Sequence, residues 1–172
     1  MKGIIYILIY LFFSTNFALS FTSNPDTKDI KTGGREDQSF MNVKNSNFKK
    51  GDDALKRAIK YLNKDKNEKA KKFLEKSLSY FLSANNETPN NTNVLNLLGF
   101  VYSLEGDLIM SEIYYLEGLN VDPNNRLINK GLGQLYFNTK RVNLAKERLK
   151  VLEKCNCREF FELKEIMTKI NN

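Results

Sequence analysis

The chain has 172 residues, of which 41% are hydrophobic, and it contains three Pro, no Trp and no His. This composition fits one helical domain with flanking segments and argues against a disulfide scaffold or a fully disordered chain. The net charge of +7 comes from scattered Lys interleaved with Glu, which is typical of a solvated surface rather than of a nucleic-acid-binding arm; attraction to an acidic partner is the alternative.

The first twenty residues have the layout of a secretory signal peptide. Lys2 supplies a positive charge, residues 4–13 are almost purely apolar, and Ala18-Leu19-Ser20 offers small residues at the spacing that a signal peptidase recognises. We therefore expect an exported protein that is cleaved after Ser20. An uncleaved membrane anchor is the alternative, although the apolar core is shorter than the roughly 20 residues that a spanning helix needs.

A polar segment follows over residues 21–50. It contains Pro25 and Gly33-Gly34 among several Asp, Asn, Ser and Lys residues. Such a segment buries too little apolar surface to offset the loss of conformational entropy on ordering. We therefore predict a disordered linker that extends to Lys50.

A repeat with a period of 34 residues occupies most of the remaining chain. The unit Leu-Gly-x-x-Tyr spans residues 98–102 and recurs over residues 132–136. An earlier, weaker copy has Ala58 and Tyr61 at the Gly and Tyr positions. In all three copies a small residue follows the Tyr after nine positions, namely Ala70, Ser111 and Ala145. This pattern resembles the tetratricopeptide repeat.

The resemblance implies an all-α fold, a short right-handed solenoid of about three helical hairpins. We place these hairpins over residues 51–88, 92–125 and 126–157, so that the repeats cover 51–157, and we expect the first to be about six residues longer than the others. Thr92 and Asn125 are the expected N-caps. Gly118 stands where the family usually has Ala, which predicts a helix loosened by roughly 1 kcal/mol.

Residues 158–172 predict one more helix, which would cap the solenoid with a polar outer face. Partner-helix binding is the alternative for its apolar stripe. Cys155 and Cys157 lie just before this helix. Export favours a disulfide that fixes the capping helix, with free thiols, an intermolecular bond, or redox or metal function as alternatives. The chain also resembles small exported bacterial tetratricopeptide proteins with a Cys pair in this turn, which implies the periplasm or cell envelope.

No constellation of catalytic residues stands out in the sequence. Without His, the usual general base and the Ser-His or Cys-His arrangements are missing. Gly33-Gly34 is isolated and Gly131-x-Gly133 lies inside a predicted helix, so neither forms a phosphate-binding loop. We therefore predict no enzymatic activity, no cofactor and no metal site.

The resemblance also implies a binding site, because in this family the first helix of each hairpin lines a concave groove for peptides or helices. Leu55, Ile59 and Leu62 would contribute from the first hairpin. The groove residues of the second and third hairpins would be Asn93, Asn96, Phe100, Ser103, Leu127, Lys130, Gln134 and Phe137. The two Phe would anchor an apolar side chain, while Asn96, Lys130 and Gln134 would hold an extended backbone or a carboxylate. Alternatively, the Phe belong to the core and the polar groups are merely solvated.

The sequence therefore predicts an exported tetratricopeptide protein that acts as a protein–protein interaction adaptor or scaffold in the cell envelope. Its partner would be a protein or peptide rather than nucleic acid. The alternative is a basic structural protein that associates electrostatically with an anionic envelope surface. Self-association remains open, because a short array leaves its end faces to be covered.

Overall fold

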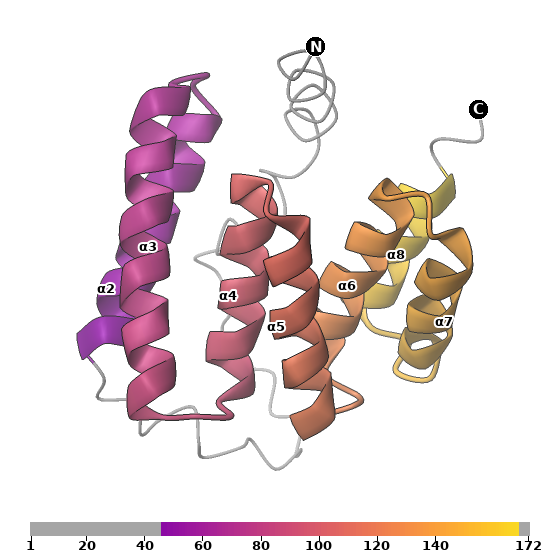
Figure 1. The fold of residues 1–172 in the computed structure, drawn as a ribbon. Coiled ribbons are helices and arrows are strands. Elements are labelled where there is room, and N and C mark those ends of the chain that lie inside the picture. Colours follow the sequence, from indigo (N-terminus) through magenta and orange to yellow (C-terminus); the bar gives the residue numbers. More distant parts are fainter. Residues whose placement is uncertain (1–45, 169–172) are drawn as a thin grey trace, which may run out of the picture.

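The computed structural model describes residues 46–168, and the predicted signal peptide and residues 21–45 of the predicted linker lie outside this range. The described chain folds into seven α-helices (Figure 1). Their bounds are α2 Ser46–Leu62, α3 Asn67–Glu87, α4 Thr92–Glu105, α5 Leu108–Val121, α6 Arg126–Asn138, α7 Val142–Glu153 and α8 Arg158–Thr168. Within residues 46–168 no helix combines the length and the apolar character that crossing a bilayer requires.

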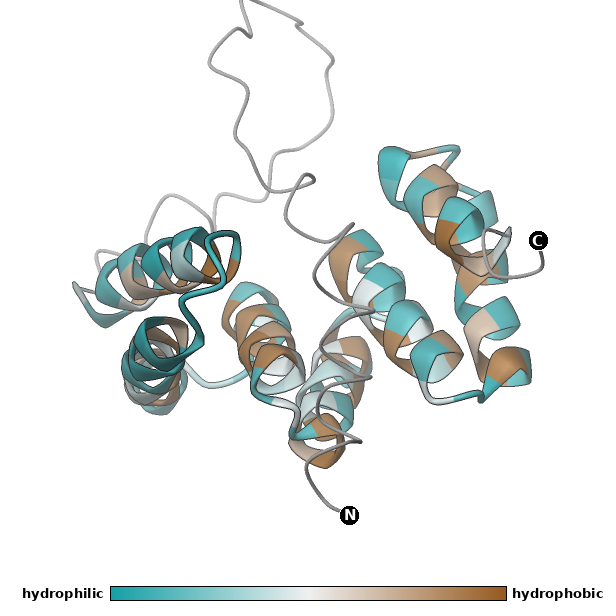
Figure 2. Ribbon diagram, turned by 90° about the horizontal axis from the view of Figure 1, so that it is seen from above, coloured by the Kyte–Doolittle hydropathy of each residue, from teal (hydrophilic) through white to brown (hydrophobic). Residues whose placement is uncertain are grey.

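Consecutive helices pair into three antiparallel hairpins, α2–α3, α4–α5 and α6–α7, and each hairpin packs on the next. Viewed end on in Figure 2, helices α2, α4, α6 and α8 follow an arc, while α3, α5 and α7 form a second row behind it. We call the first row the inner face and the second row the outer face. The fold is thus the expected all-α repeat solenoid, with α8 as an additional inner helix after the third hairpin.

The three hairpin turns have the same geometry, which confirms the register deduced from the weak first copy. Each turn contains one residue in the left-handed region, namely Asp65, Gly106 and Lys140. Each is closed by the same backbone hydrogen bond, donated by a residue five positions after the repeat Tyr: Lys66 to Tyr61 O, Asp107 to Tyr102 O and Arg141 to Tyr136 O. This six-to-one bond is the mark of a Schellman C-cap.

The small residues of the repeat lie where the two helices of a hairpin approach each other. Ala70, Ser111 and Ala145 are fully buried. Beside them the repeat Tyr stacks on an aromatic ring of the second helix, with 5.4 Å between ring centroids for both Tyr61–Phe73 and Tyr102–Tyr114. Close backbone approach and ring stacking therefore act together in the first two hairpins.

Two hairpins share a packing device that the sequence pattern did not reveal. In the second hairpin, Ser111 of α5 donates a hydrogen bond to Gly99 O of α4 at 2.7 Å, and the Tyr115 ring one turn further covers Gly99. In the first, Ser77 of α3 donates to Gly51 O of α2 at 2.9 Å, and Phe81 covers Gly51. The hydroxyl and the ring together hold the paired helices at short range.

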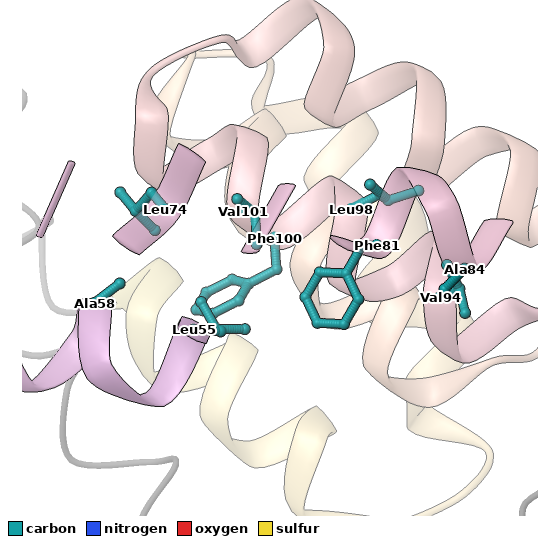
Figure 3. Packing of buried hydrophobic residues seen from close by; sticks show 9 residues of the cluster. All are labelled: Leu55, Ala58, Leu74, Phe81, Ala84, Val94, Leu98, Phe100 and Val101. Atoms are coloured by element: carbon teal, nitrogen blue, oxygen red, sulfur yellow. The ribbon is translucent and has the colours of Figure 1, made fainter. Parts of the chain in front are cut away.

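The largest hydrophobic cluster joins the first hairpin to α4 (Figure 3). Its buried members come from α2, α3 and α4 and are Leu55, Ala58, Leu74, Phe81, Ala84, Val94, Leu98, Phe100 and Val101. A second cluster of buried residues joins α5, α6 and α7, and a third packs α8 against α7. Because no hairpin buries its apolar side chains alone, the array is stable only as a stack.

The predicted linker extended too far. We predicted disorder up to Lys50, but α2 begins at Ser46. Phe48 packs edge-to-face on Phe81 with 5.9 Å between ring centroids, and Asn47 donates a hydrogen bond to Glu87 at 2.6 Å. The long helix α3 therefore packs against an extra turn of α2. The polar composition of that turn led us to predict disorder instead of helix.

Two local predictions from helix chemistry also need correction. The N-cap of α4 is Asn91 rather than Thr92, since the Asn91 side chain accepts hydrogen bonds from the backbone N–H of Asn93 and Val94. The predicted cap Asn125 is confirmed by a 3.2 Å bond from Ile128 N.

At Gly118, the lower helix propensity of Gly is only part of the reason why the residue matters. A Cβ atom there would lie 2.5 Å from Cδ1 of the fully buried Ile128, so the missing side chain makes room for the next hairpin.

Candidate functional site

The predicted groove residues lie on α4 and α6, the central helices of the inner face, but Phe100 does not serve as a surface anchor. It is only 7% exposed and belongs to the core cluster between the first two hairpins. Figure 3 shows its ring directed toward Leu55 of α2, another predicted groove residue that is buried. The alternative that Phe100 is a core residue is thus correct, because the rotation of one hairpin against the next turns this side chain inward.

Lys130 is already paired within the chain. Its Nζ donates a hydrogen bond to Glu162 Oε2 of α8 at 2.7 Å, and both side chains are largely buried. Arg158 of α8 contacts the other oxygen of the same carboxylate at 3.2 Å. We predicted that Lys130 would bind a carboxylate of a partner. In the structure Lys130 instead pairs with the carboxylate of Glu162 in the same chain.

The remaining predicted groove residues differ in their contacts and in their exposure to solvent. Ser103 donates a hydrogen bond to Phe100 O at 2.7 Å, and Phe137 packs at the margin of the second core cluster. Leu127 is exposed, and Asn93, Asn96 and Gln134 are partly exposed. Within residues 46–168 the side-chain amides of Asn93, Asn96 and Gln134 make no hydrogen bond, so these amides are available to a ligand, and Asn96 and Gln134 are the two that lie in the middle of their helices.

Tyr115 fixes the distance between the two central inner helices. Its ring lies against both Gly99 of α4 and Gly131 of α6. The phenol is fully buried and hydrogen-bonds to Ser103, and this burial raises the pKa of Tyr115 well above its ordinary value. A side chain on either Gly would move α4 relative to α6, and thereby the Asn96 and Gln134 amides.

Sequence reasoning missed the role of Gly131, which we noted only as part of a Gly-x-Gly pair inside a helix. The pair itself was a usable signal, because two Gly in a helix without a turn indicate close contacts on two sides. Gly131 faces Tyr115, while a Cβ on Gly133 would lie 2.6 Å from Cδ2 of Leu163 in α8.

On the other side of the third hairpin, Arg141 connects the α6–α7 turn to α5. Its guanidinium donates two hydrogen bonds to Glu112, at 2.9 and 2.7 Å, and stacks 4.5 Å from the Tyr136 ring centroid. Burial and the neighbouring Glu112 carboxylate raise the pKa of Tyr136 to about 12. This cluster holds hairpins two and three together.

The described residues offer no metal site, since no group of His, Cys, Asp and Glu within 46–168 is arranged to hold an ion. Cys155 and Cys157 are joined in the structure by a disulfide across one residue, with 5.1 Å between their Cα atoms. Cys157 packs against Leu152 of α7 and Leu163 of α8. The cysteines therefore lie at the junction between the third hairpin and α8, as the predicted role in fixing this helix requires.

Comparison with known proteins agrees with this geometry. Residues 92–125, the second hairpin and the turn after it, match the family model of the tetratricopeptide repeat. The chain thus contains a match to the tetratricopeptide repeat over its second hairpin. Among solved structures it is similar to the first TPR of Spaghetti (RPAP3) bound to the HSP90 peptide SRMEEVD, with a TM-score of 0.51 and 16% identity over 73% of this chain and 96% of that chain. No curated protein matches the sequence significantly.

The tetratricopeptide fold is a scaffold for protein–protein interaction, and its hairpins here present two kinds of surface. The inner face carries the amides of Asn96 and Gln134 beside the Lys130–Glu162 pair. The outer face carries the exposed charged side chains of α3 and α7 on either side of α5.

The α4–α5 turn provides a prediction about pH. Burial, followed by the negative charges of Glu75 and Asp107, raises the pKa of Glu105. Because the pKa of Glu105 is higher in the folded chain than in the unfolded chain, its ionised form destabilises the fold. This loss of stability grows as the pH rises above the unfolded pKa of about 4.3. Glu105→Gln should therefore raise the urea midpoint at about pH 7 and leave it unchanged at about pH 3.5. The exposed Glu153→Gln is the control; an equal shift for both variants would contradict the prediction.

Proposed function

We propose that this tetratricopeptide protein is an exported adaptor that binds a peptide or a helix of a partner protein on its inner face, in the periplasm or cell envelope. The observation that carries the proposal is the pair of unbonded amides, Asn96 on α4 and Gln134 on α6, on the face formed by the first helices of the hairpins. An amide side chain offers both a donor and an acceptor, which suits the backbone of a bound peptide.

Two further observations support this proposal. The similar structure, the first TPR of Spaghetti, holds a peptide, so a fold of this kind accommodates such a ligand. The sequence of residues 1–20 has the layout of a secretory signal, which directs the search for the partner to exported proteins. We expect the mature chain to begin at Phe21.

The position of α8 limits where the partner lies. Because Glu162 neutralises Lys130 and Leu163 packs against Gly133, the inner surface of α6 is partly covered by α8. A ligand that reaches Gln134 must therefore run between α4 and α8 rather than across the whole third hairpin. A short extended segment fits this restriction better than a long helix.

The test is recovery of a partner from the envelope fraction at about 0.15 M salt, with the mature chain as bait. Asn96→Ala/Gln134→Ala removes both amides, and each lost hydrogen bond weakens binding by about 0.5–1.5 kcal/mol, so the double variant should lose roughly tenfold or more in affinity. The matched control is Asn86→Ala/Asn143→Ala, which removes two exposed amides from the outer helices α3 and α7.

A protein that the wild type and the control recover, and the inner-face variant loses, supports the adaptor function. Equal recovery by all three chains would exclude the inner face. If that recovery also disappeared steeply as salt was raised, the result would favour the alternative, electrostatic attachment to an anionic surface by exposed Lys such as Lys69, Lys72 and Lys76.

A further inference from the structure

The outer face of α5 carries an apolar stripe that the inner-face proposal does not use. Ile109, Ile113 and Leu116 are 74%, 48% and 42% exposed. Their spacing of four and three residues places them on one side of the helix, opposite the buried Tyr115 and Gly118. Three large aliphatic side chains therefore lie together in solvent on the central outer helix.

The repeat provides an internal comparison, because each position of α5 has a counterpart in α3 and α7. The counterparts of Ile109, Ile113 and Leu116 lie 41 residues earlier and 34 residues later. They are Glu68, Lys72 and Glu75 in α3 and Asn143, Glu147 and Lys150 in α7, and all six are polar and exposed. The fold does not need apolar residues at these positions, so packing within the array does not explain why α5 has them.

Charge also distinguishes the second hairpin from its neighbours. Residues 92–121 contain four acidic residues and no Lys or Arg, a net charge of −4. Residues 46–87 contain eleven basic and six acidic residues, and residues 126–153 contain seven and two, so each of these hairpins carries +5. The central hairpin is therefore an acidic and apolar segment in a basic protein.

Two of the four acidic residues border the stripe. Glu112 follows Ile109 by three residues and Glu117 follows Ile113 by four, which places one carboxylate on each side of the aliphatic row. Glu112 is bound by Arg141, whereas Glu117 forms no ion pair within the described residues. An apolar stripe with acidic edges is complementary to a helix that has an apolar stripe with basic edges.

We propose that the outer face of α5 is a second docking surface, which binds a basic amphipathic helix of a partner protein. The aliphatic side chains supply the apolar contact, and Glu117 selects Lys or Arg on the partner. A second copy of the chain fits less well, because pairing α5 with α5 brings acidic edges together. An anionic membrane is disfavoured for the same reason.

The experiment uses the mature full-length chain and two synthetic helical peptides of roughly 18 residues. One has Leu at helical spacing and Lys elsewhere, and the other has Glu in place of each Lys. Fluorescence anisotropy at about 0.15 M salt should show at least tenfold tighter binding of the Leu–Lys peptide than of the Leu–Glu peptide. Ile113→Ser should weaken Leu–Lys binding at least tenfold, and Glu117→Gln should weaken it severalfold.

Two control variants make the result specific to α5. Phe161→Ser removes an equally exposed hydrophobic side chain from α8, and Asn96→Ala/Gln134→Ala alters the inner face; both should bind the Leu–Lys peptide as the wild type does. Loss of binding in these controls, or unchanged binding in Ile113→Ser, would overturn the proposal while leaving the inner-face adaptor intact.

Sedimentation and vesicle assays test the other occupants of the stripe. A dimer of the wild type that Ile113→Ser dissociates would assign α5 to a second copy. Binding to vesicles of anionic phospholipid that Ile113→Ser abolishes would assign it to a lipid surface. Either result would replace the basic helix as the occupant.

Discussion

Replacing Gly99 by Ala should destabilise the protein by about 2–3 kcal/mol, although Ala is the better helix former. A Cβ atom at Gly99 would lie 2.6–2.9 Å from three carbon atoms of the Tyr115 ring. The ring has little room to move away, because it is fully buried and lies so close to α6 that a Cβ built on Gly131 would also be only 2.7 Å from its Cζ. Urea unfolding followed by circular dichroism would measure the change in the free energy of unfolding.

The control for this prediction is the same substitution in a Tyr115→Leu background. Without the ring, the steric conflict is absent, so Gly99→Ala should cost much less than it does in the wild type. The difference between the two costs is the coupling energy of the Gly99–Tyr115 contact. If Gly99→Ala stabilised the wild-type chain by the roughly 1 kcal/mol expected from helix propensity alone, the close packing would be refuted.

Leu163→Ala should be the most damaging substitution in α8, with a loss of about 3 kcal/mol. Leu163 is fully buried, contacts Gly133 of α6 and packs in a cluster with Leu152 and Cys157. Its removal leaves a cavity where α8 meets α6 and α7. Hydrogen exchange should show the loss of protection first in α6, α7 and α8.

Phe161→Ala on the same helix is the matched control. Phe161 is 53% exposed, so its truncation should change stability by less than about 0.5 kcal/mol. Similar losses for Phe161→Ala and Leu163→Ala would mean that α8 does not cap the array in the observed orientation. Loss of protection spread evenly over all hairpins would show that the array unfolds as one unit.

Much of the fold was predictable from spacing. The positions of Tyr61, Tyr102 and Tyr136 located three hairpin turns with the same closing hydrogen bond, and the nine-residue step from each Tyr located the buried small residues. The early start of α2 was not predictable, because residues 46–50 are mostly polar and become helical through contacts with the distant end of α3.

The candidate site was only partly predictable. Register placed Asn96 and Gln134 on the first helices of their hairpins, where the structure has them. It could not show that Phe100 turns into the core or that Glu162 neutralises Lys130. Those outcomes depend on how one hairpin is rotated against the next and on where α8 docks.

The sequence by itself determined the helical repeat, its period and the positions of the close contacts within each hairpin, because these follow from local periodicity and from the need for a small residue at each helix crossing. Only the tertiary structure decided which inner residues stay available and which outer side chains remain uncovered. Ile109, Ile113 and Leu116 have the spacing of an ordinary buried stripe, and their exposure is fixed by contacts between hairpins. Those contacts join side chains far apart in the sequence, beyond the reach of any local pattern.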